Sequence, residues 1–306
     1  MFTLAHLTDP HIGPLPEPGF RALMGKRLSG YLSWTKNRHR IHNMDILRAL
    51  TEDMRAQQPD QIALTGDIVN ISLPEEFSQA RRWLDEFAPP ERLSLVPGNH
   101  DAYVSMPYAH GLGKWQDYMS SNAEAAPFLP PEHQPFPWLR LFGNIAMIGL
   151  SSAEPTWPFV AGGHVGRRQF AILSELLAKL GAENFFRIVL IHHPPLPGFN
   201  SFRKGLWDAE ELRSVLCTHG AELVLHGHNH RAMFSRLEGP GGPIAIAGAP
   251  SASARKSARH PAAGYYLFDI EQIDGSWHCS SRVRNLNEGH SGFVDGEALF
   301  STLVYS

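Results

Sequence analysis

The sequence has little of several features that mark particular protein classes. With two cysteines, Cys217 and Cys279, among 306 residues, it cannot carry a disulfide framework. No run of about 18 apolar residues occurs, so no transmembrane helix is expected. The start, MFTLAHLTD, lacks the basic and apolar regions of a signal peptide. A formal net charge of −3 gives no reason to expect a nucleic-acid polymer as partner. These absences predict a soluble, cytoplasmic protein.

The sequence also lacks the common glycine motifs for phosphate binding. It contains no GxxxxGK[ST], and no dinucleotide-binding glycine fingerprint follows the first expected strand. Histidine, by contrast, is abundant, with 17 residues. Clustered imidazoles matter because they are the commonest transition-metal ligands. A hydrophobic content of 43% is enough for a sizeable core, and we expect one domain over residues 1–306.

Short apolar runs alternate with amphipathic stretches along most of the chain. This alternation predicts an α/β fold with βαβ units and a mainly parallel sheet. The tail 240–306 has strand-like runs separated by glycine and proline, and is expected to complete a second sheet or to form an oligomer contact. The cluster EGPGGP at 238–243 predicts a hairpin connection. The expected strands are 2–7, 61–65, 92–96, 145–150, 186–191, 222–225, 244–248, 265–270 and 277–283, and the expected helices are 41–57, 74–87, 169–180 and 209–218.

Polar side chains follow five of these strands, at the point where each strand ends. Because sites form outside the carboxyl ends of parallel strands, we expect these side chains to lie close together. Oxygen and nitrogen ligands without thiolate suit Mn, Fe, Co or Zn. Two such ions about 3.5–4 Å apart can clamp an in-line phosphoryl displacement and supply the attacking hydroxide. The residues, strand by strand, are Asp9 and His11; Asp67; Asn99, His100 and Asp101; His192 and His193; and His228 and His230.

The motifs D-x-H, GD, GNHD, HHPP and GHNH, in this order, resemble those of the calcineurin-like metallophosphoesterase superfamily. The resemblance covers roughly residues 3–230 and is strongest to bacterial class III cyclic-nucleotide phosphodiesterases and glycerophosphodiesterases. It implies a four-layer αββα sandwich, in which helices flank two mixed β-sheets and a dinuclear metal site lies at the carboxyl ends of strands. The implied cofactors are two divalent or trivalent ions, chosen from Mn²⁺, Fe²⁺/Fe³⁺, Zn²⁺ and Co²⁺.

The resemblance also implies a role for each motif residue. His100 would touch the phosphate and protonate the leaving group, and Asp101 would orient its ring. His193 would lie behind the ligands or contact substrate. Asn70 stands where purple members of the family have a tyrosine, so no tyrosinate-ligated enzyme is expected. Like His193, Asn70 would lie behind the ligands or contact substrate. The implied metal ligands are Asp9, His11, Asp67 and His230 for one ion, and Asp67, Asn99, His192 and His228 for the other.

Residues 18–42, PGFRALMGKRLSGYLSWTKNRHRIH, interleave basic with apolar and aromatic side chains. Three interpretations stay open: an ordinary surface helix or oligomer contact, a lid over the substrate, and a peripheral membrane contact. His39 and His42 in this segment are expected to be solvated. His6 and His226 are expected to be packing residues. No metal binding is expected of His110, His133, His164, His219, His260, His278 and His290.

The resemblance and the motif chemistry together predict a metal-dependent phosphodiesterase. Its expected substrates are 3′,5′- or 2′,3′-cyclic nucleotides or small glycerophosphodiesters. An alternative is a lipid pyrophosphatase of the type that cleaves UDP-2,3-diacylglucosamine, in which segment 18–42 would cover acyl chains. An alternative of another class is a non-catalytic binding module, which the complete set of ligand residues opposes. A homo-oligomer is compatible with each alternative.

Overall fold

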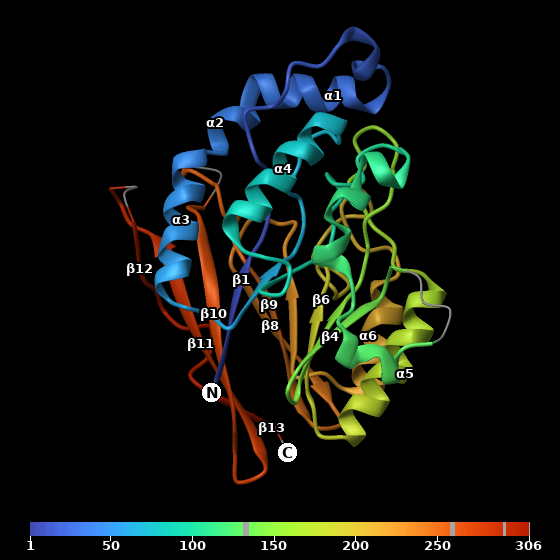
Figure 1. Ribbon diagram of the computed structural model, residues 1–306, viewed down its shortest axis with the longest axis vertical. Helices are drawn as coiled ribbons and strands as arrows, with labels where there is room; N and C mark the ends of the chain where they lie inside the picture. The colour runs from blue at the N-terminus through green and yellow to red at the C-terminus, as the bar shows by residue number, and fades with distance from the viewer. Residues whose placement is uncertain (131–134, 258–260, 290–291, 306) are drawn as a thin grey trace.

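A computed structural model describes residues 1–130, 135–257, 261–289 and 292–305 (Figure 1). Two β-sheets form its centre. The first sheet consists, in order, of β12 (Phe293–Asp295), β11 (Ser276–Leu286), β10 (Gly264–Ile273), β1 (Phe2–Leu7), β2 (Gln61–Leu64) and β3 (Leu93–Leu95), with β13 (Leu303–Tyr305) paired to β11. The second sheet consists, in order, of β4 (Trp138–Phe142), β5 (Ile145–Gly149), β6 (Phe186–Leu190), β7 (Leu223–His226), β9 (Gly242–Gly248) and β8 (Met233–Gly239).

Helices cover the outer faces of both sheets. Helices α3 (Met44–Ala56) and α4 (Pro74–Phe87) share one apolar core with the first sheet and with the inner face of the second. Helices α5 (Arg167–Ala182) and α6 (Ala209–His219) share another core with the outer face of the second sheet (Figure 1). The four-layer αββα sandwich is therefore confirmed. None of the helices in the described ranges is both long and apolar enough to cross a membrane.

Strand β6 shows why the second sheet can lie between two cores. Phe186, Ile188 and Leu190 belong to the core between the sheets, whereas Val189 and Ile191 belong to the core under α5 and α6. Successive side chains of a strand point to opposite faces, so a strand covered on both sides is mostly apolar, and a charged residue such as Arg187 must be paired there. This accounts for the apolar run 188–191 in the sequence.

Segment 18–42 is largely helical and lies above the sheets, at the top of Figure 1. It contains α1 (Lys26–Ser33), a π-helical turn (Trp34–Arg38) and α2 (His39–Ile41), preceded by a 3-10 turn (Phe20–Leu23). Three further 3-10 segments join β3 to β4, at Tyr108–His110, Leu112–Met119 and Ala123–Phe128.

Both sheets are mixed, as the family resemblance implied, and the fold is not the one mainly parallel sheet that the alternation of strands and helices alone suggested. Pairing is parallel only within β1–β2–β3 and within β5–β6–β7–β9. The tail does not simply complete the second sheet, because only β9 joins it there, whereas β10 to β13 extend the first sheet. The cause is antiparallel pairing of β10 with β1, in which Leu4 lies opposite Phe268. Strands β4, β8, β12 and β13 were not predicted, but the hairpin at 238–243 is confirmed by the β8–β9 pairing.

Two helix ends also differ from expectation. The helix expected from residue 41 begins at Met44, because the Asn43 side chain accepts hydrogen bonds from the amides of Asp45 (2.8 Å) and Ile46 (3.1 Å). The helix expected to stop before Gly181 continues through it to Ala182.

A buried ion pair fastens β6 to the start of β7, and its loss should destabilise the fold. The Arg187 guanidinium lies 2.5 Å from Glu222 and also donates to the carbonyls of Leu177 (3.1 Å) and His219 (2.8 Å). We expect Arg187→Ala to cost about 3–5 kcal/mol of unfolding free energy, because Glu222 would stay buried without its partner. Urea titration measures this change. The control Arg48→Ala removes the exposed pair with Asp45 and should leave the transition unchanged; equal losses in both variants would contradict the assignment.

Candidate active site

The five motif loops meet, but they come from two sheets. They follow β1, β2 and β3 in the first sheet and β6 and β7 in the second. Five of the residues on these loops have left-handed backbone conformations that side chains rarely adopt, which shows how sharply the loops turn. Their φ angles are 52° at Asp9, 42° at His11, 55° at Asp67, 70° at His228 and 52° at His230.

The first cluster consists of Asp9, His11, Asp67 and His230, whose ligand atoms all lie within 4.8 Å of one another. Asp9 Oδ1 is 3.1 Å from His230 Nε2, and the Nε2 atoms of His11 and His230 are 3.3 Å apart. Ligands of one transition-metal ion are spaced about 3 Å apart, because each bond is about 2.1 Å long. Asp9 Oδ1 is buried and has no hydrogen-bond partner. These residues therefore fit a metal ion.

The second cluster combines Asp67 with Asn99, His192 and His228. Asp67 Oδ2 lies 3.4 Å from His192 Nε2, and Asn99 Oδ1 lies 3.2 Å from the same nitrogen and 2.8 Å from His228 Nδ1. The other ring nitrogen of His192 donates to the Thr65 carbonyl (2.7 Å), which turns Nε2 toward the cluster. Asp67 belongs to both clusters, so its carboxylate can bridge two ions.

The neighbours of Asp67 keep its carboxylate ionised, and an ionised carboxylate attracts a cation. Burial alone would raise the pKa of Asp67, but the neighbouring imidazoles, His192 first, hold it well below its usual range. Burial alone would lower the pKa of His192, but the Asp67 carboxylate raises it to about 9. An ionised carboxylate surrounded by imidazole nitrogens is the donor set that divalent transition metals prefer.

Two glycines allow the loops to approach Asp67. A Cβ atom on Gly98 would lie 2.3 Å from Asp67 Oδ1, and one on Gly66 would lie 2.4 Å from the Gly98 amide nitrogen. Gly66 also has φ of 86°, a conformation that favours glycine. The glycines of GD and PGNHD are therefore required by the packing of one loop against the other.

His100 faces the pocket beside the two clusters. Its amide donates to Asp67 Oδ1 (2.7 Å), and its Nδ1 donates to the Asn70 carbonyl. Because a carbonyl only accepts, Nδ1 carries the ring proton and Nε2 is left facing Arg38, whose guanidinium lies 3.0 Å away. Burial, reinforced by the charge of Arg38, lowers the pKa of His100 to about 3. His100 can donate from Nε2 only when doubly protonated.

Asp101 does not orient the ring of His100, and that prediction is wrong. Its carboxylate accepts four backbone hydrogen bonds, from the amides of Asp67 (2.8 Å), Ile68 (2.9 Å), Val69 (3.0 Å) and Gly98 (2.8 Å). Asp101 therefore fixes the two loops that carry Asp67 and Asn99, and the Asn70 carbonyl takes the role of orienting His100.

Asn70 and His193 lie behind the clusters. The Asn70 side chain is buried and donates to the Ile12 carbonyl (2.9 Å). His193 is also buried, with Nδ1 2.7 Å from Ser152 Oγ and Nε2 3.1 Å from the Ala161 carbonyl. Both nitrogens of His193 therefore have protein partners, and its ring packs 4.5 Å from that of His228.

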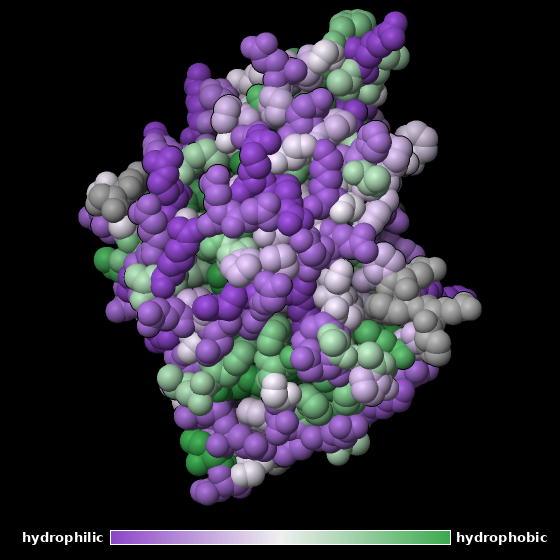
Figure 2. All heavy atoms as spheres, viewed as in Figure 1, coloured by the Kyte–Doolittle hydropathy of each residue, from purple (hydrophilic) through white to green (hydrophobic). Residues whose placement is uncertain are grey.

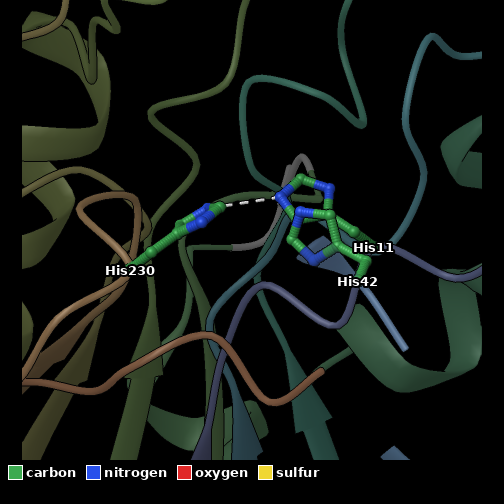
Figure 3. Close-up of side chains that lie close together, drawn as sticks. All are labelled: His11, His42 and His230. Atoms are coloured by element: carbon green, nitrogen blue, oxygen red, sulfur yellow. Dashed lines mark hydrogen bonds between the residues drawn. The ribbon is translucent and has the colours of Figure 1, made fainter. Parts of the chain in front are cut away.

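His42 is buried and not solvated, so its prediction is wrong. Its ring centroid lies 4.4 Å from that of His11, and its Nδ1 lies 2.8 Å from Ser253 Oγ. Figure 3 shows His42 beside His11, with His230 pointing toward them from across the site. The reason is that the chain entering α3 is held against the loop between β9 and β10, where the Asn43 amide donates to the Ser253 carbonyl (2.9 Å). His42, His11 and His230 offer a further set of neighbouring ring nitrogens.

Arg38 and Lys26 are pocket residues that the motifs did not reveal. Both belong to segment 18–42 and line a cavity of about 610 Å³ together with Asp67, Asn99 and His100. The only signal in the sequence was the basic character of the segment, which did not indicate which cation enters the site. Their position favours the lid interpretation of segment 18–42.

The remaining histidines lie apart from the clusters or outside the described residues. His6 and His226 are buried as packing residues, as predicted, and His39 is exposed. His164 lies 3.4 Å from Asp208, away from the ligands. His133, His260 and His290 lie outside the described residues.

Replacing Gly98 by alanine should disrupt the site more than the fold. The added methyl group would collide with Asp67 Oδ1, so we expect Gly98→Ala to lose most of the bound metal. Metal analysis of the purified protein measures this, and circular dichroism checks folding. Gly19→Ala is the control, because a Cβ there meets nothing within 4 Å. Full metal content in Gly98→Ala would contradict the geometry.

Comparisons with known proteins identify the family of the chain. A family model for calcineurin-like phosphoesterases matches residues 2–232. The glycerophosphodiester phosphodiesterase GpdQ of Enterobacter lignolyticus is 35% identical over 245 residues, which cover 76% of this chain and 72% of GpdQ. A Synechococcus protein named probable cyclic nucleotide phosphodiesterase is 25% identical over 233 residues, which cover 75% of this chain and 78% of that protein.

A solved structure shows the same fold. The crystal structure of a dimetal phosphatase from Danio rerio has a TM-score of 0.61 at 12% identity, covering 99% of this chain and 98% of that chain. The match over residues 2–232 and the 35% identity to GpdQ both exceed what a shared fold alone would give. The chain therefore belongs to the calcineurin-like phosphoesterase family and is a metal-dependent hydrolase of phosphoric esters.

Proposed function

We propose that this phosphoesterase hydrolyses small phosphodiesters, glycerophosphodiesters first and cyclic nucleotides second. The observation that carries the proposal is the sharing of Asp67 between two ligand clusters, which suits a two-metal displacement at phosphorus. The order of substrates follows the names of the relatives at 35% and 25% identity.

The two clusters supply the proposed metal ligands. Two bound divalent ions would activate a water molecule and neutralise charge on the phosphoryl oxygens. We assign the first ion to Asp9, His11, Asp67 and His230, and the second to Asp67, Asn99, His192 and His228.

Arg38 and His100 are placed to hold the phosphoryl group. The Arg38 guanidinium lies 3.0 Å from the Nε2 atoms of both His11 and His100, so it sits directly over the clusters. A planar guanidinium can donate two parallel hydrogen bonds to phosphate oxygens and keeps its charge at every relevant pH. His100 lies beside Arg38, with its ring fixed by the Asn70 carbonyl. The pair would therefore orient a phosphodiester for in-line attack.

The exposed apolar side chains beside the pocket support a second candidate, hydrolysis of an acylated pyrophosphate. Phe159 lines the pocket and is 80% exposed, and Leu32 on the nearby helix α1 is also exposed. Acyl chains could cover such surface. Activity on an acylated nucleotide sugar in detergent, without activity on soluble diesters, would favour this candidate.

Removing Asp67 should abolish both metal binding and catalysis. We expect Asp67→Ala to lose both ions and to lower kcat/KM on bis(p-nitrophenyl) phosphate by on the order of 10³-fold or more, because both clusters depend on this carboxylate. Mn²⁺-supplemented assays and metal analysis measure the two effects. The exposed Glu271→Ala is the control. Wild-type protein that binds two ions but cleaves no diester would overturn the proposal, as would faster cleavage of p-nitrophenyl phosphate.

Removing Arg38 should weaken catalysis without removing the metals. We expect Arg38→Ala to lower kcat/KM by on the order of 10²-fold, equivalent to about 2.7 kcal/mol, and Arg38→Lys to restore part of it, because lysine keeps the charge but not the bidentate geometry. Inorganic phosphate should also inhibit Arg38→Ala less strongly. Arg40→Ala, two residues away and exposed, serves as the matched control. Unchanged kinetics in Arg38→Ala with full metal content would remove Arg38 from the mechanism.

A further inference from the structure

Exposed apolar side chains gather around the mouth of the pocket. Nine of the fourteen large apolar side chains that are exposed in the described part of the chain lie in segments 18–42, 155–166 and 194–207, which make up about a sixth of the sequence. Large exposed apolar patches on soluble domains mark interaction sites. The nine residues are Phe20, Met24, Leu28, Leu32, Trp157, Phe159, Phe199, Phe202 and Trp207. We call this surface the apolar-basic face.

Helix α1 and the turn before it supply a regular part of this face. Phe20, Met24, Leu28 and Leu32 recur every four residues and are 88%, 70%, 48% and 46% exposed. Residues four apart lie on one side of a helix, so Leu28 and Leu32 form one stripe on α1. Figure 2 shows hydrophobic side chains among hydrophilic ones at the top of the view, where α1 and its preceding turn lie in Figure 1.

The opposite side of α1 is fixed to the protein. A Cβ atom on Gly30 would lie 2.6 Å from the Ile71 side chain, so the helix backbone packs closely there. Lys26 Nζ donates to Thr156 Oγ1 (2.6 Å) and to the Val160 carbonyl (3.1 Å), which ties α1 to segment 155–166. That segment is tied in turn to 194–207, because the Ala161 amide donates to the Arg203 carbonyl (2.7 Å). The three segments therefore form one continuous, firmly held surface.

The charged side chains within the three segments are all basic, and the exposed Glu17 and the half-buried Glu154 lie directly before two of them. The chain as a whole has 30 acidic and 27 basic residues, yet the three segments contain no Asp or Glu. They contain eight Lys and Arg residues, of which Arg21, Lys36, Arg40 and Lys204 are among the exposed ones. A surface that mixes apolar side chains with cations complements the interface of an anionic bilayer. There the headgroups carry negative charge and the acyl chains beneath them are apolar.

We propose that the apolar-basic face docks on an anionic lipid bilayer, with the pocket opening toward the headgroups. A second copy of the chain fits the face less well, because a twofold contact would bring the same cations against each other. A bilayer containing anionic lipid accepts the aromatic and aliphatic side chains at its interface and pairs the cations with phosphate. Phe159 and Lys204 line both the face and the pocket, so docking places the site at the membrane surface.

Vesicle co-sedimentation of the metal-loaded protein tests the proposal. We expect binding to vesicles containing phosphatidylglycerol to exceed binding to pure phosphatidylcholine vesicles by about tenfold or more, and to weaken as salt is raised, because the cations are attracted to the anionic headgroups and salt screens that attraction. The variant Phe20→Ser/Met24→Ser/Leu28→Ser should lose this binding while its kcat on a soluble diester stays unchanged.

A matched triple variant controls for general loss of surface hydrophobicity. Ile273→Ser/Val294→Ser/Val304→Ser changes side chains that are 43%, 48% and 52% exposed elsewhere on the molecule, and should bind vesicles as wild type does. No binding of wild type to anionic vesicles, or equal binding by both triple variants, would overturn the proposal. So would a dimer that dissociates only in the Phe20/Met24/Leu28 variant, since a second copy would then occupy the face. The result does not depend on which phosphoric ester is hydrolysed.

Discussion

The carboxylate of Asp67 is the constraint on which the rest of the structure depends. Its Oδ2 lies between His11 of the first sheet (3.9 Å) and His192 of the second (3.4 Å), and its Oδ1 accepts the amide of His100. A buried carboxylate in such a place needs positive charge around it. The close approach of the two sheets, the glycines at 66 and 98, and the four amides that hold Asp101 all serve to place this one group.

The left-handed backbone at the ligand positions follows from the same constraint. Asp9 and His11 lie within three residues and both leave the β conformation as soon as β1 ends. Such conformations cost of order 1–3 kcal/mol each and persist only where surrounding contacts impose them. Here the Asp9 amide donates to the Gly66 carbonyl (3.0 Å), and the His11 amide donates to the Asp67 carbonyl (3.1 Å). Hydrogen bonds between the two loops therefore hold the backbone of Asp9 and His11 in the conformation that places their side chains in the site.

Much of the fold could be predicted from the sequence because local signals were strong. The apolar run of β6, the amphipathic period of α4 and the polar residues at each strand end all depend on neighbours along the chain. What depends on distant pairing could not be predicted. The placement of β10 beside β1 and the burial of His42 result from contacts more than 200 residues apart. Arg38 contacts His11 and His100, which are 27 and 62 residues away, and the composition of its segment did not show which of its cations would reach them.

The central claim is that Asp67 joins two metal ions, and anomalous scattering from Mn²⁺-soaked crystals tests it most directly. The account predicts two peaks about 3.5–4 Å apart with the Asp67 carboxylate between them. One peak should lie among Asp9, His11 and His230, and the other among Asn99, His192 and His228. A single peak, or two peaks of which only one touches Asp67, would contradict the account.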